Sequence, residues 1–214
     1  MSASLDSAVP QILCMKVDPQ GAQQYRVRNG ERIKYPSSYP RPSSVTRPSI
    51  YNGDLKTGLS SRRLNGVNDV WNDIQINVLD LQPTVQLNDG VFETLVSNSA
   101  IAGLQTAPST PELSASDEKV AVVAKIAPSN FKIGQIERET RGYQMLQQRG
   151  ASHLGPRFLG HVHEGGCMMG FLLEKLEGRS HTSPEEFSRC EAVLGRLHEL
   201  GLSHRDIRRD IFLC

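Results

Sequence analysis

The most strongly strand-like segment of the chain reads Lys119-Val-Ala-Val-Val-Ala-Lys-Ile-Ala127. Its side chains are apolar on both faces of an extended strand, which is typical of a strand in the middle of a sheet. Lys125 shares one face with Ala121 and Val123, so its ammonium group lies in apolar company. Either this lysine reaches solvent at the strand edge, or it meets a carboxylate from a neighbouring element.

The next segment supplies a carboxylate. Residues Asn130 to Gln148 predict a helix that Gly150 ends, with an apolar stripe at helical spacing formed by Ile133, Ile136, Tyr143 and Leu146. Glu139 falls three residues after Ile136 and four before Tyr143, on the buried stripe. Glu137 falls on the solvent side. Because an unpaired buried charge is strongly unfavourable, we expect Glu139 to form an ion pair with Lys125.

Further apolar segments predict strands around this one. Asn88-Asp89-Gly90 and Glu164-Gly165-Gly166 contain the turn residues of β-hairpins, and each lies between two strand-like segments. The expected strands are residues 84–87, 91–96, 158–162 and 167–173, with a half-buried strand at 74–78. We expect residues 84–87, 91–96, 119–127, 158–162 and 167–173 to form one antiparallel sheet, with the 130–148 helix packed against it. This is an α+β fold.

Residues 1–70 are predicted to be an N-terminal extension, partly disordered or linker-like. Residues 11–17 have the composition of a short strand, and Asn29-Gly30 indicates a hairpin within residues 25–35. The apolar residues of this hairpin do not segregate, so we expect it on the surface. Residues 35–51 contain four prolines and are interpreted as an extended linker. Residues 35–66 should therefore make few contacts with the sheet.

A second helix is predicted near the end of the chain. Ser183-Pro184-Glu185-Glu186 contains the serine, proline and glutamate of a capping box, and Gly201 supplies the residue after the last turn. Its expected buried face comprises Phe187, Cys190, Val193 or Leu194, Leu197 and Leu200. His204-Arg205-Asp206 follows soon after, and the four residues 207–210 then lead into the apolar segment Ile211-Phe212-Leu213.

Composition argues against several classes of protein. The 214 residues suit one domain, or one domain with an extension, and 24 basic against 23 acidic residues leave a net charge of +1. We therefore expect no binding to nucleic acid or to a membrane. Four widely spaced cysteines are typical of reduced thiols, and the sequence has neither a secretory signal nor an apolar segment of about 20 residues. We expect a soluble cytoplasmic or nuclear protein.

Five motifs in this order resemble those of the protein-kinase-like superfamily, most closely its branch of aminoglycoside phosphotransferases and fungal kinase-like proteins. They are Val122-Val-Ala-Lys125, Glu139-x-x-x-Tyr143, Gly155-Pro-Arg-Phe-Leu-Gly160, Gly170-Phe-Leu-Leu-Glu-Lys-Leu-Glu-Gly178 and Leu197-His198-x-Leu-Gly201-x-x-His204-x-Asp206. The resemblance covers about residues 74–214. The resemblance implies a kinase-like domain over residues 71–214, with an N-lobe (an antiparallel sheet plus one helix) to about residue 176. The start of a helical C-lobe would cover residues 177–214.

The resemblance also implies a nucleotide site. Lys125 would contact the α- and β-phosphates of ATP, and Glu139 would hold Lys125 in place. Backbone groups of a hinge segment would read the adenine base, and this segment comprises Glu174, Lys175 and Leu176. ATP is therefore the expected cofactor, although weakly bound, because the turn at residues 88–90 lacks the Gly-x-Gly-x-x-Gly phosphate loop.

The catalytic loop departs from the family pattern. Asp206 would be the base that takes the proton of the incoming hydroxyl group, and His204 would brace the loop. Ile211 stands five residues after Asp206, where the family has a metal-binding Asn, and no second metal-binding Asp follows. No residue is therefore assigned as a metal ligand, and Mg²⁺ is not expected to bind well. Arg205 is typical of protein kinases, whereas the small-molecule branch more often has Gly, so the substrate stays open between a small molecule and a protein.

These departures lead to one expectation and three alternatives. The expectation is an ATP-dependent phosphotransferase by descent, catalytically impaired or truncated after the catalytic loop. The alternatives are a nucleotide-binding or scaffolding pseudokinase, an active kinase if the native chain is longer, and an unstable product of a defective gene.

His161-x-His163 offers a competing site. Two imidazoles on one strand face, with Glu164 and Cys167 nearby, could begin a zinc site. No second pair of ligands follows, so we interpret this face as an exposed one that happens to carry histidines. On that interpretation, replacing both histidines by alanine leaves the melting temperature nearly unchanged.

Overall fold

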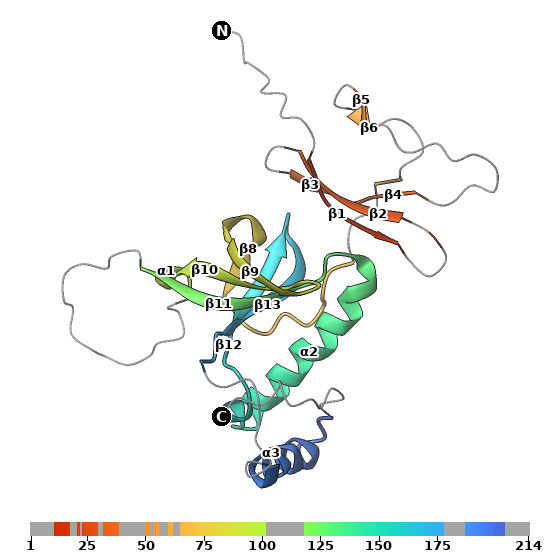
Figure 1. Cartoon of the computed structure of the whole chain (residues 1–214). Coiled ribbons are helices and arrows are strands. Elements are labelled where there is room, and N and C mark those ends of the chain that lie inside the picture. The colour runs from red at the N-terminus through yellow and green to blue at the C-terminus, as the bar shows by residue number, and fades with distance from the viewer. Residues whose placement is uncertain are drawn as a thin grey trace.

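The computed structural model describes residues 11–17, 21, 23–29, 32–38, 50–51, 54–55, 60–61, 65–101, 118–177 and 187–203. These residues form a six-stranded main sheet, a smaller N-terminal sheet, a two-stranded ribbon and two long helices, α2 and α3 (Figure 1). The fold is α+β. Within the described segments, no helix is both long and apolar enough to cross a membrane.

The main sheet has the spatial order β8-β12-β13-β11-β10-β9. Its strands are β8 (Gln75–Asn77), β9 (Gln82–Asn88), β10 (Val91–Ser97), β11 (Lys119–Ile126), β12 (Phe158–Glu164) and β13 (Cys167–Glu174). Strand β11 lies between β10 and β13, which confirms that the 119–127 segment is central. A short helix, α1 (Asn98–Ile101), follows β10.

The five strands predicted to form one antiparallel sheet do so, and the structure adds a sixth strand at one edge in the parallel direction. Strand β8 pairs parallel to β12, with Val162 opposite Ile76. Because no hairpin turn joins these two strands, nothing in the local sequence imposes an antiparallel direction. After β8 the chain turns into a 3₁₀ helix, η1 (Val78–Asp80), where the side chain of Asn77 accepts a hydrogen bond from the Leu79 N–H at 3.0 Å.

The two predicted hairpins of the main sheet are confirmed. Strands β9 and β10 are joined by Asp89-Gly90, and β12 and β13 by Gly165-Gly166. Gly90 has a φ of +77°, and a Cβ atom there would also collide with the carbonyl oxygen of Ile126. This turn therefore requires glycine for both its conformation and its close approach to β11.

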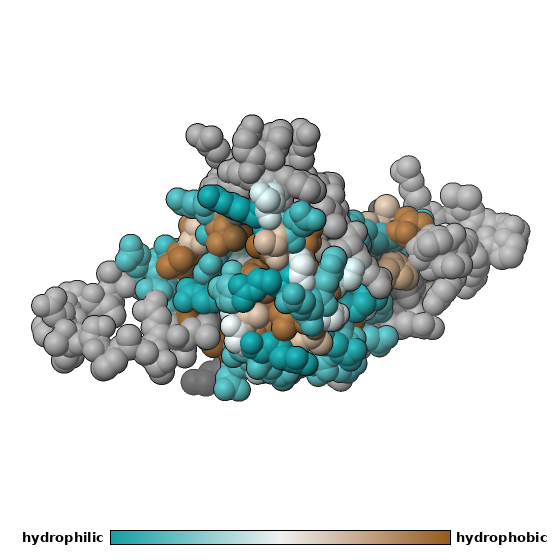
Figure 2. Space-filling model, turned by 90° about the horizontal axis from the view of Figure 1, so that it is seen from below, coloured by the Kyte–Doolittle hydropathy of each residue, from teal (hydrophilic) through white to brown (hydrophobic). Residues whose placement is uncertain are grey.

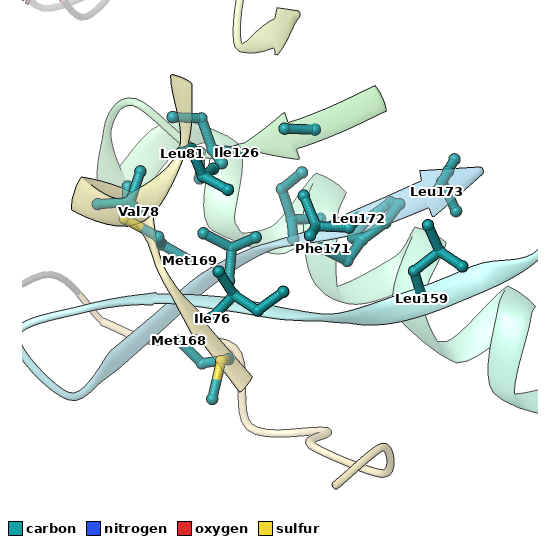
Figure 3. Close-up of a cluster of buried hydrophobic side chains, with 14 of the residues drawn as sticks. Ile76, Val78, Leu81, Ile126, Leu159, Met168, Met169, Phe171, Leu172 and Leu173 are labelled. Atoms are coloured by element: carbon teal, nitrogen blue, oxygen red, sulfur yellow. The ribbon is translucent and has the colours of Figure 1, made fainter. Parts of the chain in front are cut away.

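One face of β11 is buried more completely than the other. Val122, Ala124 and Ile126 are buried, whereas Val123 and Lys125 are half-buried. Figure 3 shows the buried cluster in which Ile76, Val78 and Leu81 from β8, η1 and the residue after it lie beside side chains of β11 and β13. The chain around β8 therefore helps to close the core.

Helix α2 spans Asn130–Gln148, as predicted, and it packs against the half-buried face. The Tyr143 ring lies 5.7 Å from the Phe171 ring and 5.8 Å from the Phe158 ring, measured between centroids. Gly150 has a φ of +65°, and the Ala151 N–H donates to the Leu146 carbonyl, so the helix ends in a Schellman motif. Thr140 is also fully buried, although it was not part of the predicted stripe.

Helix α3 spans Phe187–Glu199 and ends at Gly201, whose φ is +76°. Leu197 packs with Leu146 and Ala151, at the end of α2. Cys190 and Leu197 are buried as predicted, and Figure 2, seen from the α3 end of the molecule, shows hydrophilic residues mixed with hydrophobic ones over the coloured surface. The predicted capping box at 183–186 lies outside the described residues.

The N-terminal sheet contains β1 (Gln11–Val17), β2 (Gln23–Asn29), β3 (Arg32–Lys34), β4 (Pro36–Ser38) and β7 (Ser60–Ser61). The ribbon consists of β5 (Ile50–Tyr51) and β6 (Asp54–Leu55). The predicted strand at 11–17 is confirmed. The predicted hairpin exists too, with Asn29 of β2 paired with Arg32 of β3.

One expectation for this region is wrong. The β2–β3 hairpin is not a surface hairpin, because Tyr25, Val27 and Tyr35 are buried. The described part of residues 35–66 contacts the main sheet near its two ends: the Tyr35 hydroxyl lies 3.9 Å from the Met169 sulfur, and a Cβ at Gly66 would touch Cys167 and Met168. Strand β2 pairs with β1, β3 and β4, and the sheet that they form buries the side chains of Tyr25 and Val27. Most of the proline-rich segment lies outside the described residues.

Candidate functional site

Lys125 and Glu139 form the predicted ion pair. The Lys125 Nζ lies 2.8 Å from the Glu139 Oε2, which joins the central strand β11 to helix α2. The side chains are 31% and 29% exposed. The pair therefore lies at the margin of the buried stripe rather than within it, where a small anion from solvent can reach the ammonium group.

The expectation that Glu137 faces solvent is wrong. Its side chain is only 19% exposed, less than that of Glu139, and it pairs with Arg141 at 3.3 Å. Arg141 also pairs with Asp69, which belongs to the segment 65–74 that crosses α2. Helical phase identified the correct partner of Lys125, but it could not show that a distant segment covers the other side of the helix.

Both carboxylate oxygens of Glu139 are engaged. Lys125 binds Oε2, and the Gln135 Nε2 donates a hydrogen bond to Oε1 at 3.2 Å. Gln135 lies one helical turn before Glu139, and the i, i+4 spacing was the signal that could have found it. Burial raises the pKa of Tyr143, and the charge of Glu139, one turn earlier, raises it further. The Tyr143 hydroxyl therefore stays neutral beside the pair.

The face of the sheet next to Lys125 is an apolar platform with polar ends. Val123 lies between Glu93 on β10 and Leu173 on β13 in the strand register. Glu93 binds the Lys175 ammonium at 2.8 Å, so an ion pair from the predicted hinge crosses this face. Lys125 thus marks one end of the platform and Lys175 the other.

The predicted hinge residues lie at the end of β13. The Glu174 N–H donates to the Arg157 carbonyl at 3.0 Å, and the Glu174 carboxylate pairs with Arg157 at 3.4 Å. The Leu176 side chain is exposed. Because the Glu174 N–H already donates to the Arg157 carbonyl, recognition of an adenine base would depend on the backbone groups of Lys175 and Leu176. His204 and Asp206 lie outside the described residues.

The histidine pair does not lie on an exposed face. His161 is fully buried, and its Nε2 accepts hydrogen bonds from the backbone N–H groups of Trp71 at 3.2 Å and Asn72 at 3.4 Å. Burial lowers the pKa of His161 to about 4. Because His161 is buried on a strand that lies between two others, we now expect the double alanine variant to have a lower melting temperature. Within the described residues, no group of three or more His, Cys, Asp or Glu side chains could hold a metal ion.

A buried ion pair that sequence reasoning missed lies beside this histidine strand. The Arg26 guanidinium on β2 binds the Glu164 carboxylate at the end of β12 through both Nε and an Nη atom. The Arg26 side chain is 14% exposed and that of Glu164 only 2%. This pair fastens the N-terminal sheet to the main sheet. No sequence signal links these residues, which lie 138 positions apart.

Comparison with known proteins leaves the site to be interpreted from its geometry. A scan against models of protein families finds no match to this chain, and a search of curated proteins finds no relative.

Proposed function

We propose that the chain is a kinase-like nucleotide-binding protein, an ATP-dependent phosphotransferase by descent that binds ATP weakly and transfers phosphate poorly or not at all. One observation carries the proposal: the 2.8 Å ion pair between Lys125 on a central strand and Glu139 on the helix that packs against it. In protein kinases a strand lysine held by a helix glutamate places the ATP phosphates.

The surroundings of the pair support this proposal. Val123 is half-buried on the face that carries Lys125, and the backbone that follows β13 lies at the other end of that face. A flat apolar base, a neutral sugar and a charged phosphate chain match an apolar platform that ends in a lysine. The platform therefore fits a nucleotide better than it fits a purely apolar ligand.

Impaired transfer follows from the catalytic loop. Asp206 is present, but the side chain of Ile211, five residues later, has no atom that can bind Mg²⁺. Phosphoryl transfer depends mostly on placement and on neutralising the charge of the phosphates, and the metal ions carry much of that charge. We therefore expect the chain to retain nucleotide binding although it has lost most or all of its catalytic activity.

Titration with a fluorescent ATP analogue tests the proposal. We expect a dissociation constant nearer to about 1 mM than to about 1 μM, with little gain on adding Mg²⁺. Lys125→Ala should abolish binding. Lys119→Ala, on the same strand but bound to Gln82, is the matched control and should bind as the wild type does. Equal affinities of these two variants would contradict the proposal. ATP turnover that Asp206→Asn removes would favour an active kinase.

A further inference from the structure

The first turn of helix α2 is capped from the N-terminal sheet. The Asn130 N–H donates a hydrogen bond to the Gln24 Oε1 at 3.1 Å, from a residue 106 positions earlier. Ser129 occupies the N-cap position, but its side chain makes no capping bond with the described residues. Gln24 is only 7% exposed. It therefore supplies the acceptor that the N-cap residue of a helix ordinarily provides.

The same strand is anchored to the main sheet. Arg26 lies two residues after Gln24, on the same face of β2, and it holds the buried carboxylate of Glu164. Removing one partner of such a pair leaves a buried charge without compensation. Strand β2 therefore contacts β12 through Arg26 and the start of α2 through Gln24, and it links the two.

A second segment holds α2 as well. The Asn65 N–H donates to the Asn130 Oδ1 at 2.9 Å, and the Trp71 indole N–H donates to the Thr140 carbonyl at 3.2 Å. Both contacts come from the segment 65–74, which joins the N-terminal sheet to β8. Asn130, the first residue of α2, thus forms hydrogen bonds with two segments of the chain, and only one of these segments is β2.

Glu139 lies nine residues after Asn130, about 13 Å along the helix axis. A helix moves nearly as a rigid body, so a shift at its first turn reaches Glu139. The contact of Glu139 with Lys125 depends on that placement, because neither side chain is held by burial. Figure 1 shows the start of α2 on the side of the molecule where the N-terminal sheet lies.

We propose that strand β2 is the positioning element of the Lys125–Glu139 pair, with Gln24 and Arg26 as its positioning residues. Release of the N-terminal sheet would let α2 move away from β11 and would leave Lys125 without its carboxylate. The consequence for ligands rests on the proposed nucleotide site, whereas the coupling between β2 and the ion pair does not.

Hydrogen–deuterium exchange of the full chain tests the coupling without any nucleotide. In Gln24→Leu, the amides of residues 134–139 should exchange about fivefold faster than in the wild type, the effect of losing a helix cap. Gln24→Glu keeps an acceptor oxygen beside a helix N-terminus and should restore protection. Amides of α3 should exchange at the same rate in all three proteins. Unchanged exchange of α2 in Gln24→Leu would overturn the proposal.

A second pair of variants distinguishes a change in the position of α2 from a general loss of stability. Arg26→Met with Glu164→Met removes both charges and avoids leaving one buried and unpaired. Lys16→Met removes the exposed 2.7 Å ion pair between the same sheet and Asp89, which does not involve α2. The double variant should raise the rate at which an amine reagent modifies Lys125 about threefold, toward the rate in Glu139→Gln, and Lys16→Met should not. Equal rates in the double variant and the wild type would contradict the role of Arg26.

Nucleotide titration of the same variants tests whether the position of α2 affects the binding of ATP. If the wild type binds ATP analogues, Gln24→Leu should bind them severalfold more weakly and Gln24→Glu should not. If the wild type binds none, the proposed function fails, and the exchange and labelling results still decide whether β2 positions the pair.

Discussion

His161 is an uncharged imidazole held inside the main sheet. Its Nε2 accepts from two backbone N–H groups, and its Nδ1 makes no hydrogen bond within the described part of the chain. The ring also lies edge-on to Trp71, at 5.9 Å between centroids, and to Phe158, at 5.1 Å. A proton added to this ring would have to be accommodated in an apolar site, which explains the lowered pKa.

This histidine predicts a pH dependence of stability. The folded pKa of about 4 lies below the unfolded value near 6.5, so between these values the unfolded chain binds the extra proton. The free energy of unfolding should therefore fall as pH drops from 6.5 toward 4, by up to about 3 kcal/mol from this group. Urea unfolding should show that His161→Phe weakens this dependence while His153→Ala, an exposed control, retains it. An equal pH dependence of the free energy of unfolding in both variants would mean that a group other than His161 causes the effect.

The Arg26–Glu164 pair gives a second prediction at the level of residues. Arg26→Met should lower the free energy of unfolding by about 3–5 kcal/mol, because Glu164 is left buried and unpaired. Adding Glu164→Met should recover most of that loss, since both charges are then gone. A double variant as unstable as Arg26→Met alone would mean that the lost contacts, not the stranded charge, cause the effect. Chemical denaturation of the three proteins provides the measurement.

Among the elements, strand β13 tolerates no side chain at Gly170. A Cβ there would collide with the backbone of β11 at Lys125 and Ile126. Gly170→Ala should cost about 1–3 kcal/mol, the range for overpacking a core. Gly195→Ala in α3 is the matched control: its Cβ would meet nothing within 4 Å in the described residues, and the change should stabilise the helix by up to about 1 kcal/mol. Thermal unfolding that ranks these two variants in the reverse order would contradict this close approach of β13 to β11.

Local patterns were enough to predict most elements and one contact. The two-faced apolar segment gave β11, the helical stripe gave α2, and the helical phase of Glu139 gave its partner Lys125. These features depend on residues close in sequence. The parallel pairing of β8 and the burial of His161 depend on segments that meet only in the folded chain, so no periodicity could reveal them.

At the scale of the whole molecule, the N-terminal residues and the main sheet share one core. Tyr35 and Val67, both from the region predicted as an extension, belong to the same buried cluster as Met169 and Phe171. Packing across a predicted boundary is a long-range property, and the sequence of residues 1–70 gave no sign of it. Strand β2 itself contacts α2 through Gln24 and the main sheet through Arg26.

The central claim is that Lys125 lies beside the phosphates of a bound nucleotide. An acyl phosphate derivative of ATP tests it directly, because a lysine amine next to the phosphates attacks the acyl carbon, forms an amide and releases ATP. Mass spectrometry then identifies the acylated lysine. We expect that Lys125 is labelled, that excess ATP suppresses this labelling, and that Lys119 and Lys175 react no faster than other exposed lysines. Labelling that ATP does not suppress, or that spares Lys125, would contradict it.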